Sequence, residues 1–355
     1  DAARRDFSIN AMYYDPTTQV VVDYHNGIRD AKKRIMRMIG EPAARYREDP
    51  VRVIRAVRFM AKLSHLGFTM ERATREPLVA SARLLADVPQ SRLFDEMLKL
   101  LQTGHALATI EALQSLNLET GIYPLLDLAV ARATDPFVNQ ALSDTDRRVN
   151  EGKPVAPSFL LACVLWSDVR TGWAKRLARQ KGPRASSFPA LQEAVDEVFE
   201  SRIGDVSGRG KLGADMREIW TMQPRFEKRT PASALSLVSQ PRFRAGFDFL
   251  RLRANVGEVD SELATWWETF SLADEDVRND ILEAMRSQKG VPRKRVVKAS
   301  AAPGVDDVTD EAEPLPSSDG DAQDAPRKRR RRRRKPNDGG VSGADNGRAD
   351  SDAAE

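Results

Sequence analysis

The sequence is poor in the residue types that build disulfide frameworks and metal clusters. It contains one cysteine, Cys163, and three histidines, His25, His65 and His105, among 355 residues. A single cysteine excludes an internal disulfide framework and a multi-cysteine zinc site. The three histidines are far apart in the sequence and lack the spacing of metal ligands. We therefore expect a reducing, cytoplasmic setting for the protein.

Long apolar runs are also missing. The longest, Phe159–Trp166, is far shorter than the roughly 20 residues that cross a bilayer, and the start of the chain does not resemble a signal peptide. Hydrophobic residues make up 41% and charged residues 30% of the chain, which is typical of a globular protein. We expect no membrane partner.

The small net charge of +4 conceals an uneven distribution of charge. Beyond residue 290, acidic segments rich in Ala, Gly, Ser and Pro surround a basic run, and such blocks are typical of disorder. The run consists of Arg327, Lys328, Arg329, Arg330, Arg331, Arg332, Arg333, Arg334 and Lys335. We expect it to bind RNA or DNA phosphates, without base stacking because no aromatic residue interrupts it. A solubilising tail and a membrane-surface patch are the alternatives.

The first residues predict a β-hairpin. An apolar stretch from Phe7 leads to a turn-forming segment, Asp15–Thr18, and a second strand, Val20–Tyr24, ends before Gly27. A two-stranded hairpin is barely stable alone in water, so we expect this one to belong to a larger sheet. Because the chain opens abruptly at Asp1, we also expect a fragment whose first part is missing.

From about residue 28 onward the pattern is helical, and the predicted fold class is mainly α. A strong helix is expected from Asp49, as the N-cap, and Pro50, as the first helical residue, to about His65. Further helices are predicted near residues 71–87, 90–103, 105–117, 124–133, 136–150, 157–180, 187–203, 208–228, 231–239, 241–254, 259–270 and 274–287.

The first candidate functional motif is the charged cluster Arg4-Arg5-Asp6 at the edge of the predicted sheet. A carboxylate is a hard oxygen ligand that suits Mg²⁺, and arginine forms forked hydrogen bonds with phosphate. The alternative is a solvated charge cluster before an edge strand, because surface ion pairs are weak evidence for a site.

The second candidate motif surrounds the start of the helix at Asp49. Arg52 and Arg55 project from one side of that helix, while apolar residues project from the other. Glu48 and Asp49 stand at its start, on the side facing Arg52. A carboxylate beside a guanidinium offers the acceptor and donors needed to read a purine edge, and Arg55 could reach a triphosphate. Alternatively, Asp49 only caps the helix and pairs with Arg52.

Taken in order, Arg4–Ala11, Val21–Gly27 and Arg45–Phe59 resemble the motifs of class II template-independent RNA nucleotidyltransferases. This class contains tRNA CCA-adding enzymes and bacterial poly(A) polymerases. The chain resembles the poly(A) polymerases most, on Tyr13-Tyr14, on the segment Ser91–Gly104 and on the basic tail. The resemblance covers about residues 1–290.

The resemblance implies four parts. Residues 1–27 would be the β-hairpin remnant of an α/β nucleotidyltransferase head, and residues 28–120 a helical neck that recognises the base. Residues 121–290 would form a helical body that binds RNA. Residues 291–355 would be a disordered basic tail.

The resemblance also implies the site. In this class the head holds two Mg²⁺ ions through three carboxylates, and the match places one of them at Asp6, the catalytic residue. The other two belong to an Asp-x-Asp pair after a Gly-Gly-x-Val-Arg loop, and no such loop occurs here. The nucleotide-binding residues that the match implies are Arg5, Asn10, Glu48, Asp49, Arg52 and Arg55.

The implied function is template-independent addition of AMP from ATP to RNA 3′ ends, in polyadenylation and RNA turnover, by two-metal phosphoryl transfer. RNA 3′ ends and ATP would be the partners, with RNA-degradation machinery as a further candidate. We expect the chain alone to be inactive, because two of the three metal carboxylates are missing. The alternatives are a CCA-adding tRNA nucleotidyltransferase and a non-catalytic helical RNA-binding protein.

Overall fold

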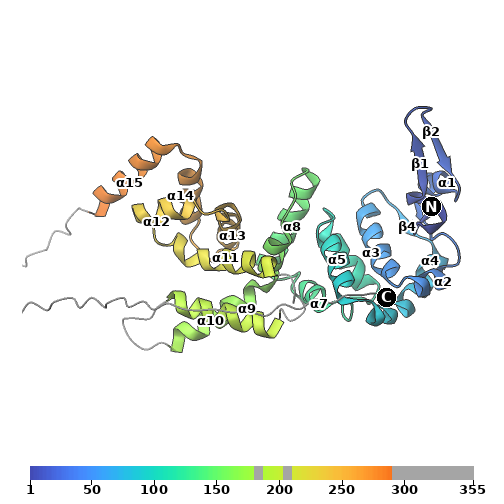
Figure 1. Cartoon of the computed structure of the whole chain (residues 1–355), viewed down its shortest axis with the longest axis horizontal. Coiled ribbons are helices and arrows are strands. Elements are labelled where there is room, and N and C mark those ends of the chain that lie inside the picture. The colour runs from blue at the N-terminus through green and yellow to red at the C-terminus, as the bar shows by residue number, and fades with distance from the viewer. Residues whose placement is uncertain (180–186, 203–209, 290–355) are drawn as a thin grey trace, which may run out of the picture. The chain divides into compact units, whose positions relative to one another are not determined.

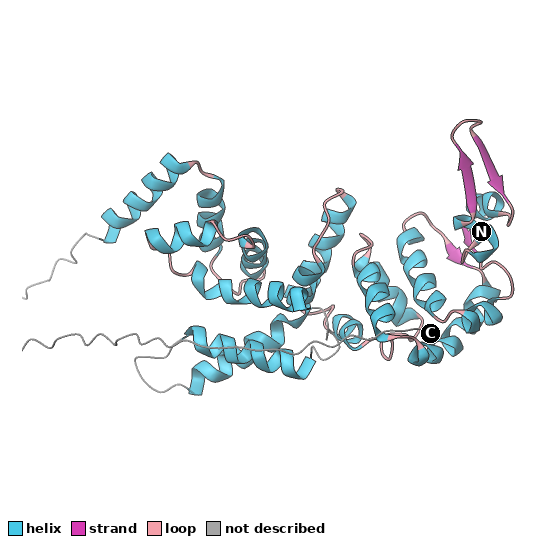
Figure 2. Ribbon diagram, in the orientation of Figure 1, coloured by secondary structure: helices cyan, strands magenta, loops and turns pink. Residues whose placement is uncertain are grey.

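The chain folds mainly into α-helices, with two small pieces of sheet near its start (Figures 1 and 2). The computed structural model describes residues 1–179, 187–202 and 210–289. The mainly α class predicted from the sequence is confirmed. The described residues all belong to one compact unit, Asp1–Arg293. The basic run at 327–335 lies outside the described residues.

The predicted hairpin forms from β1 (Met12–Asp15) and β2 (Val20–Asp23), which pair antiparallel. The Asp15 carboxylate closes the turn, because it accepts hydrogen bonds from the Thr17 N–H at 2.9 Å and the Thr18 hydroxyl at 2.7 Å. Within the described residues no third strand joins this pair. Its membership of a larger sheet therefore stays a prediction.

The extended segment expected from Phe7 is shorter than predicted. Phe7 makes a single bridge to Met38, and Ser8–Asn10 forms a 3₁₀ turn. The Asn10 side chain closes this turn by accepting a hydrogen bond from the Phe7 N–H at 3.0 Å. Because of this local hydrogen bond, Ser8–Asn10 does not pair as a strand, and β1 begins only at Met12.

A run of short helices follows the hairpin, and two residues from each of two segments add a small parallel sheet, β3 with β4. The elements are α1 (Gly27–Lys33), β3 (Ile35–Met36), α2 (Pro42–Glu48), α3 (Val51–Ser64), β4 (Thr69–Met70), α4 (Arg72–Ala82), a 3₁₀ helix (Arg83–Asp87), α5 (Gln90–Leu101) and α6 (Ala106–Ser115).

The remaining helices agree with the predicted ones to within a few residues. They are α7 (Pro124–Ala131), α8 (Pro136–Asn150), α9 (Pro157–Arg179), α10 (Ser187–Arg202), α11 (Gly210–Phe226), α12 (Pro231–Val238), α13 (Phe243–Asn255), α14 (Ser261–Leu272) and α15 (Glu275–Lys289). No helix in the described part of the chain could span a bilayer, since each is too short or too polar.

The prediction for Asp49 is wrong in two respects. Asp49 ends α2 as its C-cap, and Pro50 takes the N-cap position of α3. The break falls there because proline disfavours helical backbone at the preceding residue. The Asp49 carboxylate pairs with Arg92 on α5 at 2.9 Å, and not with Arg52. The side chain of Asp49 is therefore turned toward a neighbouring helix.

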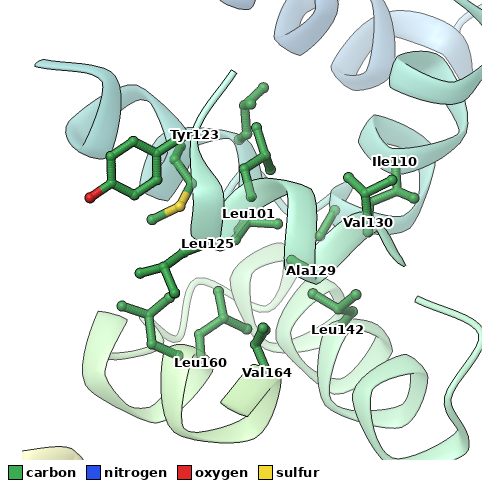
Figure 3. Packing of buried hydrophobic residues seen from close by; sticks show 14 of the residues in the cluster. Leu101, Ile110, Tyr123, Leu125, Ala129, Val130, Leu142, Leu160 and Val164 are labelled. Atoms are coloured by element: carbon green, nitrogen blue, oxygen red, sulfur yellow. The ribbon is translucent and has the colours of Figure 1, made fainter. Parts of the chain in front are cut away.

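The larger of two hydrophobic clusters extends from Phe7 to Leu252 and has α9 among its most buried elements. Figure 3 shows Leu125 of α7, Leu142 of α8 and Leu160 of α9 meeting in this cluster. A second cluster joins α11, α13 and α14 around Trp267 and Phe226, whose rings meet edge to face at 5.1 Å. These helices hold the chain together because each buries one apolar face.

Two of the histidines that are far apart in sequence come together in space. His65 directly follows α3 and His105 directly precedes α6, and their rings stack at 4.9 Å with an interplanar angle of 12°. Burial, and secondarily the charge of His65, lowers the pKa of His105. The stack ties the end of one helix to the start of another.

Candidate functional site

The two motifs singled out in the sequence meet at Asp6. Nε of Arg52 donates a hydrogen bond to Oδ1 of Asp6 at 3.1 Å, and Nη1 of Arg55 lies 3.2 Å from Oδ2. The side chains of Asp6 and Arg52 are only 9% and 7% exposed. Each of these buried charges requires the other, because an unpaired charge at this depth is strongly unfavourable.

Glu48 extends this charged cluster toward the surface. Nη1 of Arg52 donates to Oε2 of Glu48 at 3.0 Å, and Nη1 of Arg45 donates to the same oxygen at 2.7 Å. The positive charges of Arg52 and then Arg45 lower the pKa of Glu48. Glu48 therefore remains ionised at neutral pH and fixes the direction of the Arg52 guanidinium.

The Asp49 carboxylate lies close to this cluster but belongs to a different pair. One oxygen, Oδ2, accepts a hydrogen bond from Nη2 of Arg92 at 2.9 Å. The other, Oδ1, is buried and has no hydrogen-bond partner among the described residues. A buried acceptor of this kind is unfavourable until a donor reaches it. Asp49 thus has one acceptor oxygen whose hydrogen-bonding capacity is unused.

A cavity of about 520 Å³ opens beside Asp6. Its lining brings together four of the predicted site residues with cationic, acidic and apolar neighbours. The lining residues are Asp1, Arg4, Arg5, Asp6, Asn10, Arg55, Arg58, Phe59, Glu96 and Lys99. The three other predicted residues, Glu48, Asp49 and Arg52, do not line it; Arg52 reaches it through its contact with Asp6.

Three residues that line the cavity are not among the site residues predicted from the sequence: Arg58, Glu96 and Lys99. Glu96 of α5 has a side chain only 4% exposed, and one or other of its carboxylate oxygens lies 2.8 Å from Nζ of Lys99, 3.4 Å from Nη1 of Arg58 and 3.8 Å from Nε of Arg55. Arg58 could have been found, because it lies one helical turn after Arg55 on the same face. Glu96 gave no local signal, since two of its three partners lie on α3.

The surroundings of Asp6 do not fit a pair of magnesium ions. Both carboxylate oxygens face guanidinium groups, and the cavity is otherwise lined mainly by cations. In the described ranges no group of three or more His, Cys, Asp and Glu side chains could hold a metal ion. The residues present favour an anion, because arginine matches phosphate geometry.

Comparison with known proteins shows that three protein-family models match successive segments of the chain. The family model "Poly A polymerase head domain" matches residues 1–37, and "Probable RNA and SrmB-binding site of polymerase A" matches residues 67–129. "Polymerase A arginine-rich C-terminus" matches residues 184–300. The first match contains Asp6, and the second contains Glu96 and Lys99.

Individual proteins similar to the chain include poly(A) polymerases and CCA-adding enzymes. Poly(A) polymerase I of Haemophilus influenzae is 35% identical over 300 residues, covering 83% of this chain and 65% of the relative. A CCA-adding enzyme of Bacillus velezensis is 40% identical over 122 residues, which cover 34% of this chain and 29% of that enzyme. A solved structure titled tRNA-processing enzyme (apo form I) is 20% identical with a TM-score of 0.43, covering 81% of this chain and 72% of that one.

The three segments matched in the chain are all segments of polymerase A proteins. Among these proteins, the chain belongs to the bacterial poly(A) polymerase family. The chain spans about 65% of the length of the curated poly(A) polymerases that it matches.

Proposed function

We propose that the protein takes part in adding AMP from ATP to RNA 3′ ends, with release of pyrophosphate. The observation that carries this proposal is the contact of Asp6 with Arg52 and Arg55 beside a cavity lined by arginines. The 35% identity to poly(A) polymerases over most of the chain supports the same reaction. RNA 3′ ends and ATP are the proposed substrates.

In this proposal the arginines of the cavity bind the triphosphate. Arg5 and Arg55 line it and carry the forked donors that match phosphate oxygens. Asn10 holds the 3₁₀ turn that presents Asp6, because its side chain accepts the Phe7 N–H. Binding of ATP would then draw on positions fixed by the turn and by α3.

The base is read by the cluster at the start of α3. The open Oδ1 of Asp49 can accept a hydrogen bond from the amino group of adenine, which carries an acceptor beside that amino group. Arg52 supplies donors and is held in place by Asp6 and Glu48. Selection without a template requires such fixed side chains, because no base pair is available to choose the nucleotide.

The chain alone should bind ATP and RNA without transferring AMP. Asp6 is the metal carboxylate that the resemblance implies, but here two arginines occupy it, and the two magnesium ions would need further carboxylates. An assay with ATP, Mg²⁺ and an RNA primer tests this expectation. Robust tail addition by the isolated chain would contradict it.

A CCA-adding function is the second candidate, favoured by the 40% identity to a CCA-adding enzyme over 122 residues. Nucleotide binding separates the two candidates. ATP bound in preference to CTP, with no preference for tRNA, supports polyadenylation, whereas CTP binding and selectivity for tRNA lacking its 3′ end support CCA addition. RNA bound without either nucleotide would favour a non-catalytic RNA-binding protein.

The setting proposed for this activity is the cytoplasm, where ATP and RNA 3′ ends are both available. RNA-degradation machinery is the proposed protein partner, because an added tail gives an exonuclease a single-stranded start. Co-purification with and without ribonuclease treatment tests a direct contact; loss of the partner on treatment would show that only RNA bridges the two.

A further inference from the structure

A second cavity, of about 230 Å³, lies between the end of α8, the segment before α9 and the start of α13. Its apolar walls include Pro154, Phe159 and Pro241. Its charged lining residues are Asp144, Arg148, Arg242, Arg244 and Asp248. The cavity thus combines flat apolar surfaces with charged groups of both signs, of which arginines are the majority.

Asp248 is the polar centre of this cavity and is only 5% exposed. Its Oδ2 accepts hydrogen bonds from Nη1 of Arg148 at 3.0 Å and from Nε of Arg244 at 3.1 Å. Its Oδ1 lies 3.5 Å from Nη2 of Arg251 and is buried without a hydrogen-bond partner in the part of the chain that the structure describes. The position is unfavourable until a donor arrives.

Arg148, which pairs with Asp248, has a hydrogen-bond donor that lacks a partner among the described residues. Nε of Arg148 is buried and finds no acceptor within the described ranges. A bound group with an amino donor and a ring acceptor would satisfy both Asp248 and Arg148. Adenine, cytosine and guanine carry such an edge, whereas uracil has no exocyclic amino group.

We propose that this cavity binds a nucleotide of the RNA upstream of its 3′ end, an inference that rests on RNA being the substrate. The base packs between the proline and phenylalanine walls, its amino group donates to Asp248, and Arg244 binds the adjoining phosphate. Unstacked bases packed on flat side chains are a common mode of single-stranded RNA recognition. The site lies outside residues 67–129, the segment matched to an RNA-binding family model.

Helix α5 connects the two cavities. Lys99 lines the first cavity, and Gln102, directly after α5, donates a hydrogen bond to the carbonyl oxygen of Val155, which lines the second, at 2.5 Å. Lys99 and Gln102 are three positions apart in the sequence, a rise of about 4.5 Å along a helix axis. In this proposal, an RNA strand with its 3′ end in the first cavity continues toward the second.

Fluorescence anisotropy with the full chain and a labelled oligo(A) tests the proposal. Arg244→Gln removes an exposed guanidinium from the cavity, and Arg148→Gln removes a partly buried one. Each should weaken RNA binding about tenfold and lower the salt slope by about one unit if it binds a phosphate. Arg147→Gln is the matched control, because Arg147 is the neighbour of Arg148 on α8 but does not line the cavity. The control should change affinity less than about twofold.

Filling the cavity gives a second readout that leaves the charge unchanged. Ala245→Leu adds carbon atoms to its lining. RNAs with identical 3′ ends and upstream nucleotides that are all A or all U should differ in affinity for the parent chain, and this preference should disappear in the variant. Parent-like binding by all three cavity variants, or no A-over-U preference in the parent, overturns the inference and leaves the proposed function standing. A parent chain that binds no RNA overturns both.

Discussion

At the scale of single residues, Asp6 is the position on which the site depends. It is the only acidic side chain within hydrogen-bond reach of both Arg52 and Arg55 in the described residues. The same carboxylate therefore stabilises the fold and positions the proposed nucleotide-binding arginines. The two contributions can be measured separately.

Replacing Asp6 with Ala should lower the free energy of unfolding by roughly 3 kcal/mol, because Arg52 is left buried without its main partner. Urea denaturation of the parent chain and the variant gives this difference. Asp1→Ala is the matched control, since Asp1 is 65% exposed in its pair with Arg5. Equal effects of the two substitutions would contradict the importance of the buried pair.

Arg52 should matter more for ATP than for RNA. Arg52→Ala removes donors at the proposed base-reading position and should weaken ATP binding about tenfold, with a smaller change in RNA affinity. Arg52→Lys keeps the positive charge but lacks the forked donors of a guanidinium. Relative to Arg52→Ala, it should therefore recover more of the lost stability than of the lost ATP affinity. Titration calorimetry with ATP and anisotropy with RNA compare the two ligands. Equal losses for both would count against a role in reading the base.

At the scale of secondary-structure elements, the stack between α3 and α6 should make stability depend on pH. The folded protein lowers the pKa of His105 through burial, with His65, Lys62 and Asp146 as charged or titratable neighbours. The unfolded chain therefore binds the proton more tightly, and stability is lost as the pH falls below about 6.5.

Thermal melts across this pH range check the prediction. The melting temperature of the parent chain should drop as the pH falls from neutral toward the lowered pKa of His105, and His105→Asn should flatten that part of the curve. His25→Asn is the control, because the ring of His25 takes no part in the stack. A drop of the same size in both variants would rule out the stacked pair as its source.

Helix α9 should be the element whose core matters most for stability. Leu161 is fully buried in the larger cluster. Leu161→Ala should therefore destabilise the chain by about 2–5 kcal/mol, because burial is reduced and a cavity is left behind. Leu235→Ala, at a side chain that is 43% exposed on α12, is the control for the same chemical change. Comparable losses in chemical denaturation would contradict the central place of α9.

At the scale of the whole molecule, the hydrophobic clusters and one proposed RNA contact lie in different parts of the sequence. The compact unit Asp1–Arg293 contains both hydrophobic clusters. The basic run at 327–335 follows it in the sequence. RNA binding should therefore respond to deletion of residues 294–355, whereas the stability of the compact unit should not.

Deleting residues 294–355 should leave the melting temperature unchanged and lower the affinity for RNA. It should also reduce the salt dependence of binding by about one unit for each RNA phosphate that the chain no longer neutralises. Melting curves and anisotropy over a salt series give the three quantities. Replacing the run at 327–335 with Gly and Ser residues is the matched control for length. An unchanged salt slope in both variants would assign the run a solubilising role.

The sequence by itself determined most of the helices, the hairpin turn and the order of the motifs, but not helix α2 or the cap of α3. Helix α8, for example, spans the predicted residues 136–150, because Asp135, Pro136 and the apolar spacing that follows act within a few residues of one another. Arg52 and Arg55 were identified as facing one side of a helix for the same reason. Local signals of this kind do not depend on the rest of the fold.

Only the tertiary structure decided which charges meet. The packing of α3 against α5 and α6 brings Arg55 close to Glu96 and stacks His65 on His105. It also places the Asp49 carboxylate next to Arg92, so that Asp49 pairs with Arg92 and not with Arg52. Partners separated by some 40 residues leave no mark in a local pattern, because burial and distance arise only when the helices pack. The same is true of Asp248 and its open oxygen, since the walls of its cavity come from three helices.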